Sequence, residues 1–226
     1  MKILPLFFAV ISAVMPVVFQ KTGLSDKHGF PLKMLCAFMY LLTGVASAAA
    51  VYSVTEYTLM MLGALGLGVL GDFFLEYKGK RFFSLGAVFF ALGHILYSAA
   101  FLFAGDYKAI TYMGAVAVIT ALLTAAVVAF AKLKLELKGK KNLLLLYAPV
   151  LIFAFVCAVT KGAVCLNKGN ACLGLCLICG GTLFLFSDIM IGIGKGGVQR
   201  SGILHYAVSY TYFAAQALFA LSIYFQ

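Results

Sequence analysis

The chain has 226 residues, of which 64% are hydrophobic and only 11% are charged. Its mean hydropathy of +1.08 excludes an ordinary soluble domain, because a core of this size does not need so much apolar surface, whereas a set of membrane spans does. The net charge of +10 is compatible with nucleic-acid binding, but the Lys and Arg residues lie in short segments between apolar runs. We therefore expect an integral, multi-pass membrane protein without a nucleic-acid partner.

Eight apolar runs follow one another along the chain, each of about 20 residues and long enough to cross a bilayer as an α-helix. The first run, within Met1 to Gln20, resembles a signal peptide because Lys2 precedes it, but no A-x-A cleavage pattern follows and we interpret it as a span. Since the connections are short and polar, we predict an all-α fold, a bundle of eight transmembrane helices that forms a single domain over 1–226. The predicted helices cover residues 3–20, 31–53, 57–77, 82–104, 109–131, 143–161, 171–193 and 203–225.

The basic residues are distributed unevenly between the two predicted sides of the membrane. Four Lys lie on one side, and the other thirteen Lys and Arg lie on the opposite side. Because cytoplasmic loops carry an excess of Lys and Arg, we predict that both termini are outside the cytoplasm, in a bacterial inner membrane or the endoplasmic reticulum. The residues on the sparse side are Lys2, Lys108, Lys161 and Lys168.

Two aspartates lie inside predicted spans, where a charged side chain costs roughly 2.5–3.5 kcal/mol at mid-helix. Asp72 follows Gly71 about one turn from the end of the third span, and Asp188 follows Ser187 at the equivalent depth of the seventh span. Such side chains usually face the interior of a bundle and pair with other groups. We therefore predict that the two aspartates share one layer, with His94 of the fourth span at greater depth.

The last predicted helix carries a polar stripe. His205, Ser209, Tyr212 and Gln216 are spaced i, i+4, i+7 and i+11, which places them on one face of an α-helix. A polar face in lipid packs against other helices or against a wet cavity. We predict that this face lines the same cavity as the aspartates, and we assign Tyr97 of the fourth span to that cavity too.

Two interpretations of these residues stay open on physical grounds alone. A carboxylate pair in a partly dry site can hold a protonated acid beside an ionised base, which suits acid–base hydrolysis at a membrane. Alternatively, each Asp is a structural group that hydrogen-bonds to Ser187, to a Tyr or to a backbone carbonyl, and His94 is a neutral group bonded to Tyr97 or Ser98. Cys176-x-x-Cys179 matches a redox or zinc spacing, although Cys is also an ordinary small apolar residue of buried helices.

Short motifs occur in order along the third to eighth spans: Gly71-Asp72-x-x-Leu75, Phe83-x-x-Gly86, Phe90-x-x-x-His94-x-x-Tyr97, Phe184-x-x-Ser187-Asp188 and Tyr212-x-x-Ala215-Gln216. This ordered set resembles the YhhN-type lysoplasmalogenase family. The resemblance implies an eight-helix membrane protein that hydrolyses the vinyl ether bond of lysoplasmalogen to a fatty aldehyde and glycerophosphoethanolamine or glycerophosphocholine. One departure is that the family often carries a Lys-Pro pair entering its second helix, whereas here Pro31 precedes Lys33 with Leu32 between them.

The reaction that the resemblance implies needs a proton on the alkenyl carbon and water on the resulting oxocarbenium ion. We assign Asp72 and Asp188 to acid–base catalysis, without deciding which of them is the acid. We expect no metal and no cofactor; the expected partners are a lysophospholipid substrate and membrane lipid, with no obligate protein partner. The residues assigned to binding or orienting the substrate are His94, Tyr97, Ser187, His205, Tyr212, Gln216 and Lys33.

Two other functions use the same residues. A proton-coupled carrier of lipids or small molecules would use the aspartates as a relay, although the chain has no evident internal repeat of the kind found in many transporters. A zinc-dependent lipid hydrolase would draw its ligands from His94, His205, Asp72 and Asp188. Release of aldehyde from lysoplasmalogen, compared with release of fatty acid from an ester-linked lysophospholipid, distinguishes these functions.

Overall fold

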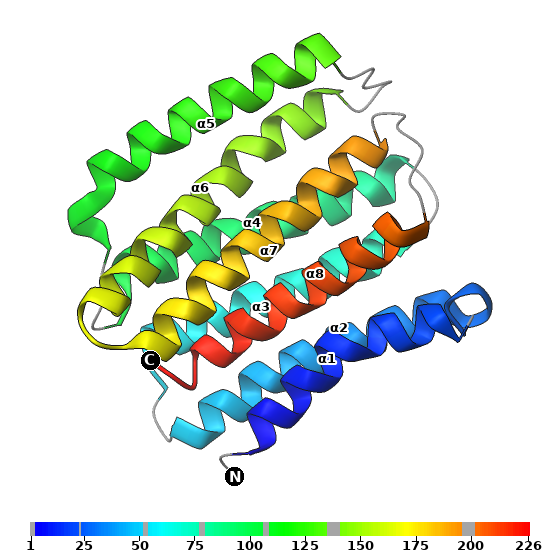
Figure 1. Cartoon of the computed structure of the whole chain (residues 1–226), viewed down its shortest axis with the longest axis horizontal. Helices are drawn as coiled ribbons and strands as arrows, with labels where there is room; N and C mark the ends of the chain where they lie inside the picture. Colours follow the sequence, from blue (N-terminus) through cyan, green and yellow to red (C-terminus); the bar gives the residue numbers. More distant parts are fainter. Residues whose placement is uncertain are drawn as a thin grey trace.

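In the computed structural model, the described residues form eight α-helices and one short 3-10 helix, with no strand (Figure 1). The structure describes residues 3–22, 24–51, 54–76, 80–105, 109–134, 141–195 and 202–226, and only the backbone for 20, 24–28, 80, 130–134, 141–145, 192–195 and 202–206. The predicted all-helical fold is confirmed for this part of the chain. The helices are α1 (Leu4–Lys21), α2 (Leu24–Val51), α3 (Glu56–Glu76), α4 (Lys80–Phe103), η1 (Ile110–Tyr112), α5 (Met113–Lys134), α6 (Lys141–Asn167), α7 (Ala171–Lys195) and α8 (Gly202–Ser222).

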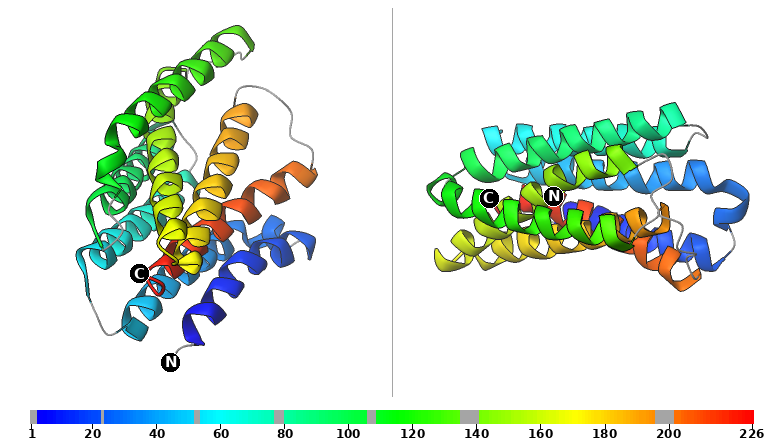
Figure 2. Two further views of the ribbon diagram at one scale, coloured as in Figure 1. Left: turned by 60° about the vertical axis from the view of Figure 1, so that its left-hand side comes forward. Right: turned by 90° about the horizontal axis from the view of Figure 1, so that it is seen from above.

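Successive α-helices run in alternating directions (Figures 1 and 2). Helices α1, α3, α5 and α7 end, and α2, α4, α6 and α8 begin, at the end of the bundle that is on the right in Figure 1; we call it the Lys33 end. Helix α8 packs against α7, α1, α2 and α3, and α4 packs against α3 and α6. Because α8 has neighbours on several sides, its residues 211–217 are all buried.

Six of the described helices are long and apolar enough to cross a membrane, which supports a multi-pass membrane protein. In α1 the apolar segment Leu4–Phe19 is shorter. Helix α5 lies at the edge of the bundle in Figure 1 and packs on α6. The apolar side chains of α5 are largely exposed, which suits a helix that faces lipid on its outer side. The six spans are Gly29–Val51, Glu56–Glu76, Arg81–Phe103, Ile110–Ala129, Leu146–Asn167 and Ala171–Ile191.

The predicted start of the second helix was wrong. We expected this helix to begin at residue 31, but α2 begins at Leu24 and Pro31 lies inside it. The prediction rested on where the apolar run begins, and residues 25–28 before Pro31 are polar or charged. Membrane helices tolerate interior proline when neighbouring groups satisfy the freed carbonyl.

Lys161 is also placed differently from the prediction, which put it at the end of the sixth helix beside a loop. Helix α6 continues to Asn167, and Lys161 is 1% exposed. Its ammonium donates to the carbonyl oxygen of Ala104 (2.7 Å) and of Ala100 (3.4 Å) and lies 4.8 Å from the ring centre of Tyr57. The last carbonyls of a helix have no partner within that helix and attract a cation, which explains how the end of α4 accommodates this lysine.

Candidate active site

Asp72 lies on α3 near the Lys33 end and is 2% exposed. Its Oδ2 accepts hydrogen bonds from the Tyr212 hydroxyl of α8 (2.7 Å) and from the Tyr40 hydroxyl of α2 (3.2 Å). Its Oδ1 lies 3.4 Å from Nζ of Lys33, which also donates to Oε1 of Glu76 at 2.8 Å. Three donors from two neighbouring helices therefore surround this carboxylate, and one of them is a cation.

The hydrogen bonds around Asp72 continue into the middle of the bundle. Gln216 Nε2 donates to the Tyr212 oxygen (3.2 Å), and the Tyr97 hydroxyl donates to Gln216 Oε1 (2.8 Å). Gln216 and Tyr97 are 1% and 2% exposed, so each depends on the other to satisfy a buried polar atom. We call this set the Asp72 group: Asp72, Lys33, Glu76, Tyr40, Tyr212, Gln216 and Tyr97.

The glycines of α3 make room for this group. A Cβ on Gly68 would lie 2.8 Å from Gln216 Nε2 and 3.0 Å from the Tyr40 hydroxyl, and a Cβ on Gly71 would lie 2.7 Å from the ring of Phe90. Small residues let helices approach closely in a membrane. Gly68 and Gly71 thus leave room for side chains from α8, α2 and α4 to pack against α3.

Asp188 belongs to a second group, built from α7, α6 and α4. The Tyr147 hydroxyl is 2.5 Å from Asp188 Oδ2, and it is 2.9 Å from His94 Nε2. His94 Nε2 is 3.7 Å from the same Asp188 oxygen. His94 is 3% exposed and the Asp188 side chain 11% exposed. We call these three residues the Asp188 group.

The ring of Phe184 on α7 contacts both groups. It lies edge-on to the imidazole of His94, with centroids 4.8 Å apart, and edge-on to the ring of Tyr212 at 5.5 Å. Among the described residues, no hydrogen bond or ion pair links Asp72 to Asp188. The structure therefore holds the aspartates in two separate groups that meet at one aromatic ring, rather than as a contacting pair of carboxyls.

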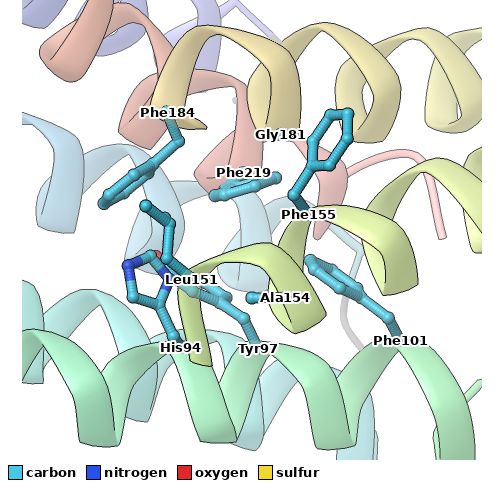
Figure 3. Close-up of a pocket in the computed structure, with 9 residues that line it drawn as sticks. All are labelled: His94, Tyr97, Phe101, Leu151, Ala154, Phe155, Gly181, Phe184 and Phe219. Carbon is cyan, nitrogen blue, oxygen red and sulfur yellow. The ribbon is translucent and has the colours of Figure 1, made fainter. Parts of the chain in front are cut away.

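A small cavity lies beside this ring, between α4, α6, α7 and α8 (Figure 3). His94 and Tyr97 line it from α4, so it borders one residue of each group. Its volume is about 10 Å³, close to the least space that one water molecule needs. Most of its wall is apolar, so it suits an apolar group better than water. The other lining residues are Phe101, Leu151, Ala154, Phe155, Gly181, Phe184 and Phe219.

A protein-family model matches most of this chain. The model of the YhhN family matches residues 30–223, which include every residue of both aspartate groups. The chain belongs to the YhhN family. Comparison with curated proteins and comparison with solved structures both find no significant match.

In this YhhN-family chain, most of the predicted site residues come together. Lys33, Tyr97, Tyr212 and Gln216 lie in the Asp72 group, and His94 lies in the Asp188 group. This arrangement follows from α8 and α4 each turning one polar face inward. The predicted i, i+4 relation of Tyr212 and Gln216 is realised as a hydrogen bond.

Two predicted site residues are not placed in either group. Ser187 was expected to act on Asp188, but its hydroxyl donates to the carbonyl oxygen of Val208 on α8 at 3.2 Å. It therefore ties α7 to α8. The side chain of His205 lies outside the described residues, so its assigned role stays a prediction. Within the described part of the chain, no three His, Cys, Asp or Glu side chains are grouped as they are around a metal ion.

Sequence reasoning missed three members of the two groups. Tyr40 and Tyr147 are the only tyrosines of α2 and α6. Tyr40 is seven residues after Lys33 and so lies on the same face of α2, a signal that was available, whereas no such spacing indicated Tyr147. The third is Glu76, the last residue of α3. A signal for it existed, because Glu76 is four residues after Asp72 and therefore lies on the same face of α3.

Proposed function

We propose that this YhhN-family protein is an intramembrane hydrolase that cleaves the vinyl ether bond of lysoplasmalogen to a fatty aldehyde and a glycerophospho-headgroup. Family membership is consistent with this activity. The observation that carries the proposal is the pair of aspartate groups: two largely buried carboxyl groups with separate hydrogen-bond partners, in groups that both contact Phe184.

The proposed reaction uses two carboxyl groups in different roles. One donates a proton to the β-carbon of the alkenyl chain, and the adjacent carbon becomes an oxocarbenium ion with the ether oxygen. The other carboxyl group stabilises this cation and takes a proton from the attacking water, as paired carboxylates do in glycoside hydrolysis. The resulting hemiacetal collapses to aldehyde and alcohol. His94 and Tyr97, which border the cavity, orient the reacting atoms.

The proposal includes an arrangement in the membrane. All eight α-helices cross the bilayer as one domain, and the Lys33 end faces the cytoplasm because thirteen of the seventeen Lys and Arg residues belong to the predicted connections at that end. Both termini are then on the opposite side, in a bacterial inner membrane or the endoplasmic reticulum. The substrate is a lysophospholipid that enters from the surrounding membrane lipid.

The first test measures products. Purified protein is incubated with lysoplasmalogen and, separately, with an ester-linked lysophospholipid, and aldehyde and fatty acid are quantified. We expect aldehyde from the first and no fatty acid from the second. Asp72→Asn and Asp188→Asn should each lower kcat at least 100-fold, since general acid–base groups typically contribute about 10²–10⁴-fold.

The matched control is Glu56→Gln, which also removes a carboxylate from α3 but at an exposed position. It should leave turnover unchanged. Hydrolysis in D₂O should place one deuterium on carbon 2 of promptly trapped aldehyde, and the glycerol hydroxyl should contain no oxygen from ¹⁸O-labelled water. Substantial turnover in either Asp variant, or label in the glycerol hydroxyl, contradicts the proposal. Lipid uptake into vesicles without product would favour the carrier.

A further inference from the structure

The two aspartates differ in the donors that surround them, and this difference bears on which one holds a proton. Asp72 accepts from two tyrosine hydroxyls and lies beside the ammonium of Lys33. Both of its oxygens are therefore engaged by donors. A proton on Asp72 would have to displace one of these donors, because a protonated carboxyl needs an acceptor of its own. This set of contacts matches the ionised form.

The direction of the remaining hydrogen bonds in the Asp72 group agrees with that form. Tyr97 donates to Gln216, Gln216 donates to Tyr212, and Tyr212 donates to Asp72. Each hydrogen bond in this series therefore donates in the direction of the Asp72 carboxylate. Lys33 is 26% exposed and Asp72 2% exposed, so the ion pair lets the buried carboxylate keep its charge.

Among the described residues, fewer donors surround Asp188 than surround Asp72. Within the described part of the chain its polar contacts are the Tyr147 hydroxyl at 2.5 Å and His94 Nε2 at 3.7 Å. Ionising it would bury a negative charge, and balancing that charge by protonating His94 would bury a positive one against the ring of Phe184. Burying charges without full hydrogen bonding costs several kcal/mol per ion.

The neutral form of the Asp188 group satisfies the same two short contacts without a buried charge. The Tyr147 hydroxyl lies within hydrogen-bond distance of both Asp188 Oδ2 (2.5 Å) and His94 Nε2 (2.9 Å). When Asp188 carries a proton, the first contact reverses: the carboxyl donates to the oxygen of Tyr147, and the hydroxyl hydrogen of Tyr147 points at Nε2 of a neutral His94. Each of the three side chains has a partner in this arrangement. The proton of the imidazole is then on Nδ1.

From these contacts we infer that Asp188 is the protonated acid of the site, that Asp72 is the ionised base, and that Tyr147 is a positioning residue that holds the Asp188 proton and connects it to His94. The roles of acid and base rest on the proposed function. The test of which aspartate holds a proton does not. It adds Tyr147, which the sequence did not indicate, to the residues that control the reaction.

The assignment gives a balanced reaction. The proton of Asp188 bonds to the β-carbon through the alkene electron pair, and the ether oxygen shares a lone pair with the neighbouring carbon. Water adds to that carbon and releases a proton to Asp72, giving a hemiacetal. When the hemiacetal collapses, its bond to the glycerol oxygen breaks, Asp72 returns a proton to that oxygen, and the hemiacetal hydroxyl returns its proton to Asp188. Both groups end as they began.

The test observes the proton directly by infrared spectroscopy. A protonated carboxyl has a C=O stretch that an ionised one lacks, and the chain has only seven Asp and Glu side chains, so the background is small. At neutral pH the wild-type protein should show one such band. Asp188→Asn should remove it, whereas Asp72→Asn and the control Glu56→Gln should leave it in place. Each variant is checked for its helix content and melting temperature.

A second variant keeps the test decisive should Asp188→Asn fold poorly. Tyr147→Phe removes the hydrogen-bond partner of the carboxyl but not the carboxyl, so the band should stay and shift in frequency. It should also lower kcat more than tenfold with little change in KM. No band in the wild-type protein, a band lost in Asp72→Asn, or a band that Tyr147→Phe does not shift would overturn the assignment. Since no turnover is needed to record the band, this test can fail or succeed whether or not lysoplasmalogen is the substrate.

Discussion

At the scale of single residues, the Asp72 group depends on a position that has no side chain. Gly68 lies where a Cβ would come within 2.8 Å of Gln216 Nε2. Since that atom is the far end of a flexible side chain, Gln216 can move away, but only by giving up its hydrogen bond to Tyr212. A methyl group on this glycine therefore acts on the hydrogen-bond chain more than on the packing of the helices.

We expect Gly68→Ala to lower kcat several-fold while the melting temperature changes little. The lost hydrogen bond destabilises the protein by about 1 kcal/mol, and the better helix propensity of Ala offsets a similar amount. Activity assays and thermal unfolding in detergent measure the two effects separately.

The control for Gly68→Ala is Gly66→Ala in the same helix. A Cβ on Gly66 meets nothing within 4 Å, so this variant gains the helix propensity of Ala without a clash with another side chain. It should keep full activity and melt at the same or a higher temperature. Equal activity losses in the two alanine variants would show that the hydrogen-bond chain is not what Gly68 protects.

At the scale of helices, α6 and α7 approach each other closely at a pair of glycines. A Cβ on Gly162 would lie 2.9 Å from the backbone oxygen of Gly174, and a Cβ on Gly174 would lie 2.8 Å from that of Gly162. Backbone atoms cannot rotate away as a side chain can. This contact lies toward the end of the bundle opposite the Lys33 end, so it sets the spacing of the two helices that carry Tyr147 and Asp188.

Gly162→Ala and Gly174→Ala should therefore each destabilise the bundle by about 1–3 kcal/mol, the usual cost of overpacking a close contact. The melting temperature in detergent measures this. The double variant should lose less stability than the sum of the losses in the two single variants, because the first substitution already separates the helices.

Gly114→Ala on α5 is the control for these variants, since a Cβ there meets nothing within 4 Å. It should not lower the melting temperature. Full additivity of Gly162→Ala and Gly174→Ala would mean that the two glycines do not form one contact.

The sequence predicted which helices exist better than how they face one another. Runs of apolar residues indicated every α-helix, because a membrane span needs length and apolarity alone. Asp72, Gln216 and His94 were rightly expected to face inward, since polar groups avoid lipid. The tyrosines that hold the aspartates were not predicted: lipid and protein core are both apolar, so the pattern around Tyr40 or Tyr147 does not show which side faces the bundle.

At the scale of the whole molecule, the proposed orientation places the Lys33 end at the cytoplasm. In a background with the exposed Cys172 and Cys179 replaced by Ala, a cysteine introduced as Lys138→Cys should react with a membrane-impermeant thiol reagent from the cytoplasmic side only. Lys168→Cys, at the exposed turn between α6 and α7, is the matched position at the other end and should react from the opposite side only. The reverse labelling pattern would invert the protein in its membrane.

Lys161 has a consequence for how the folded state of this protein can be followed. Its ammonium is enclosed between α6, the end of α4 and the ring of Tyr57. A water-soluble acylating reagent therefore reaches this amine only during moments when α4 and α6 separate. The rate at which this one lysine is acylated, read by mass spectrometry beside the rate for the exposed Lys168, gives the frequency of that opening. Acylation of Lys161 therefore reports how often the interior of the folded protein opens.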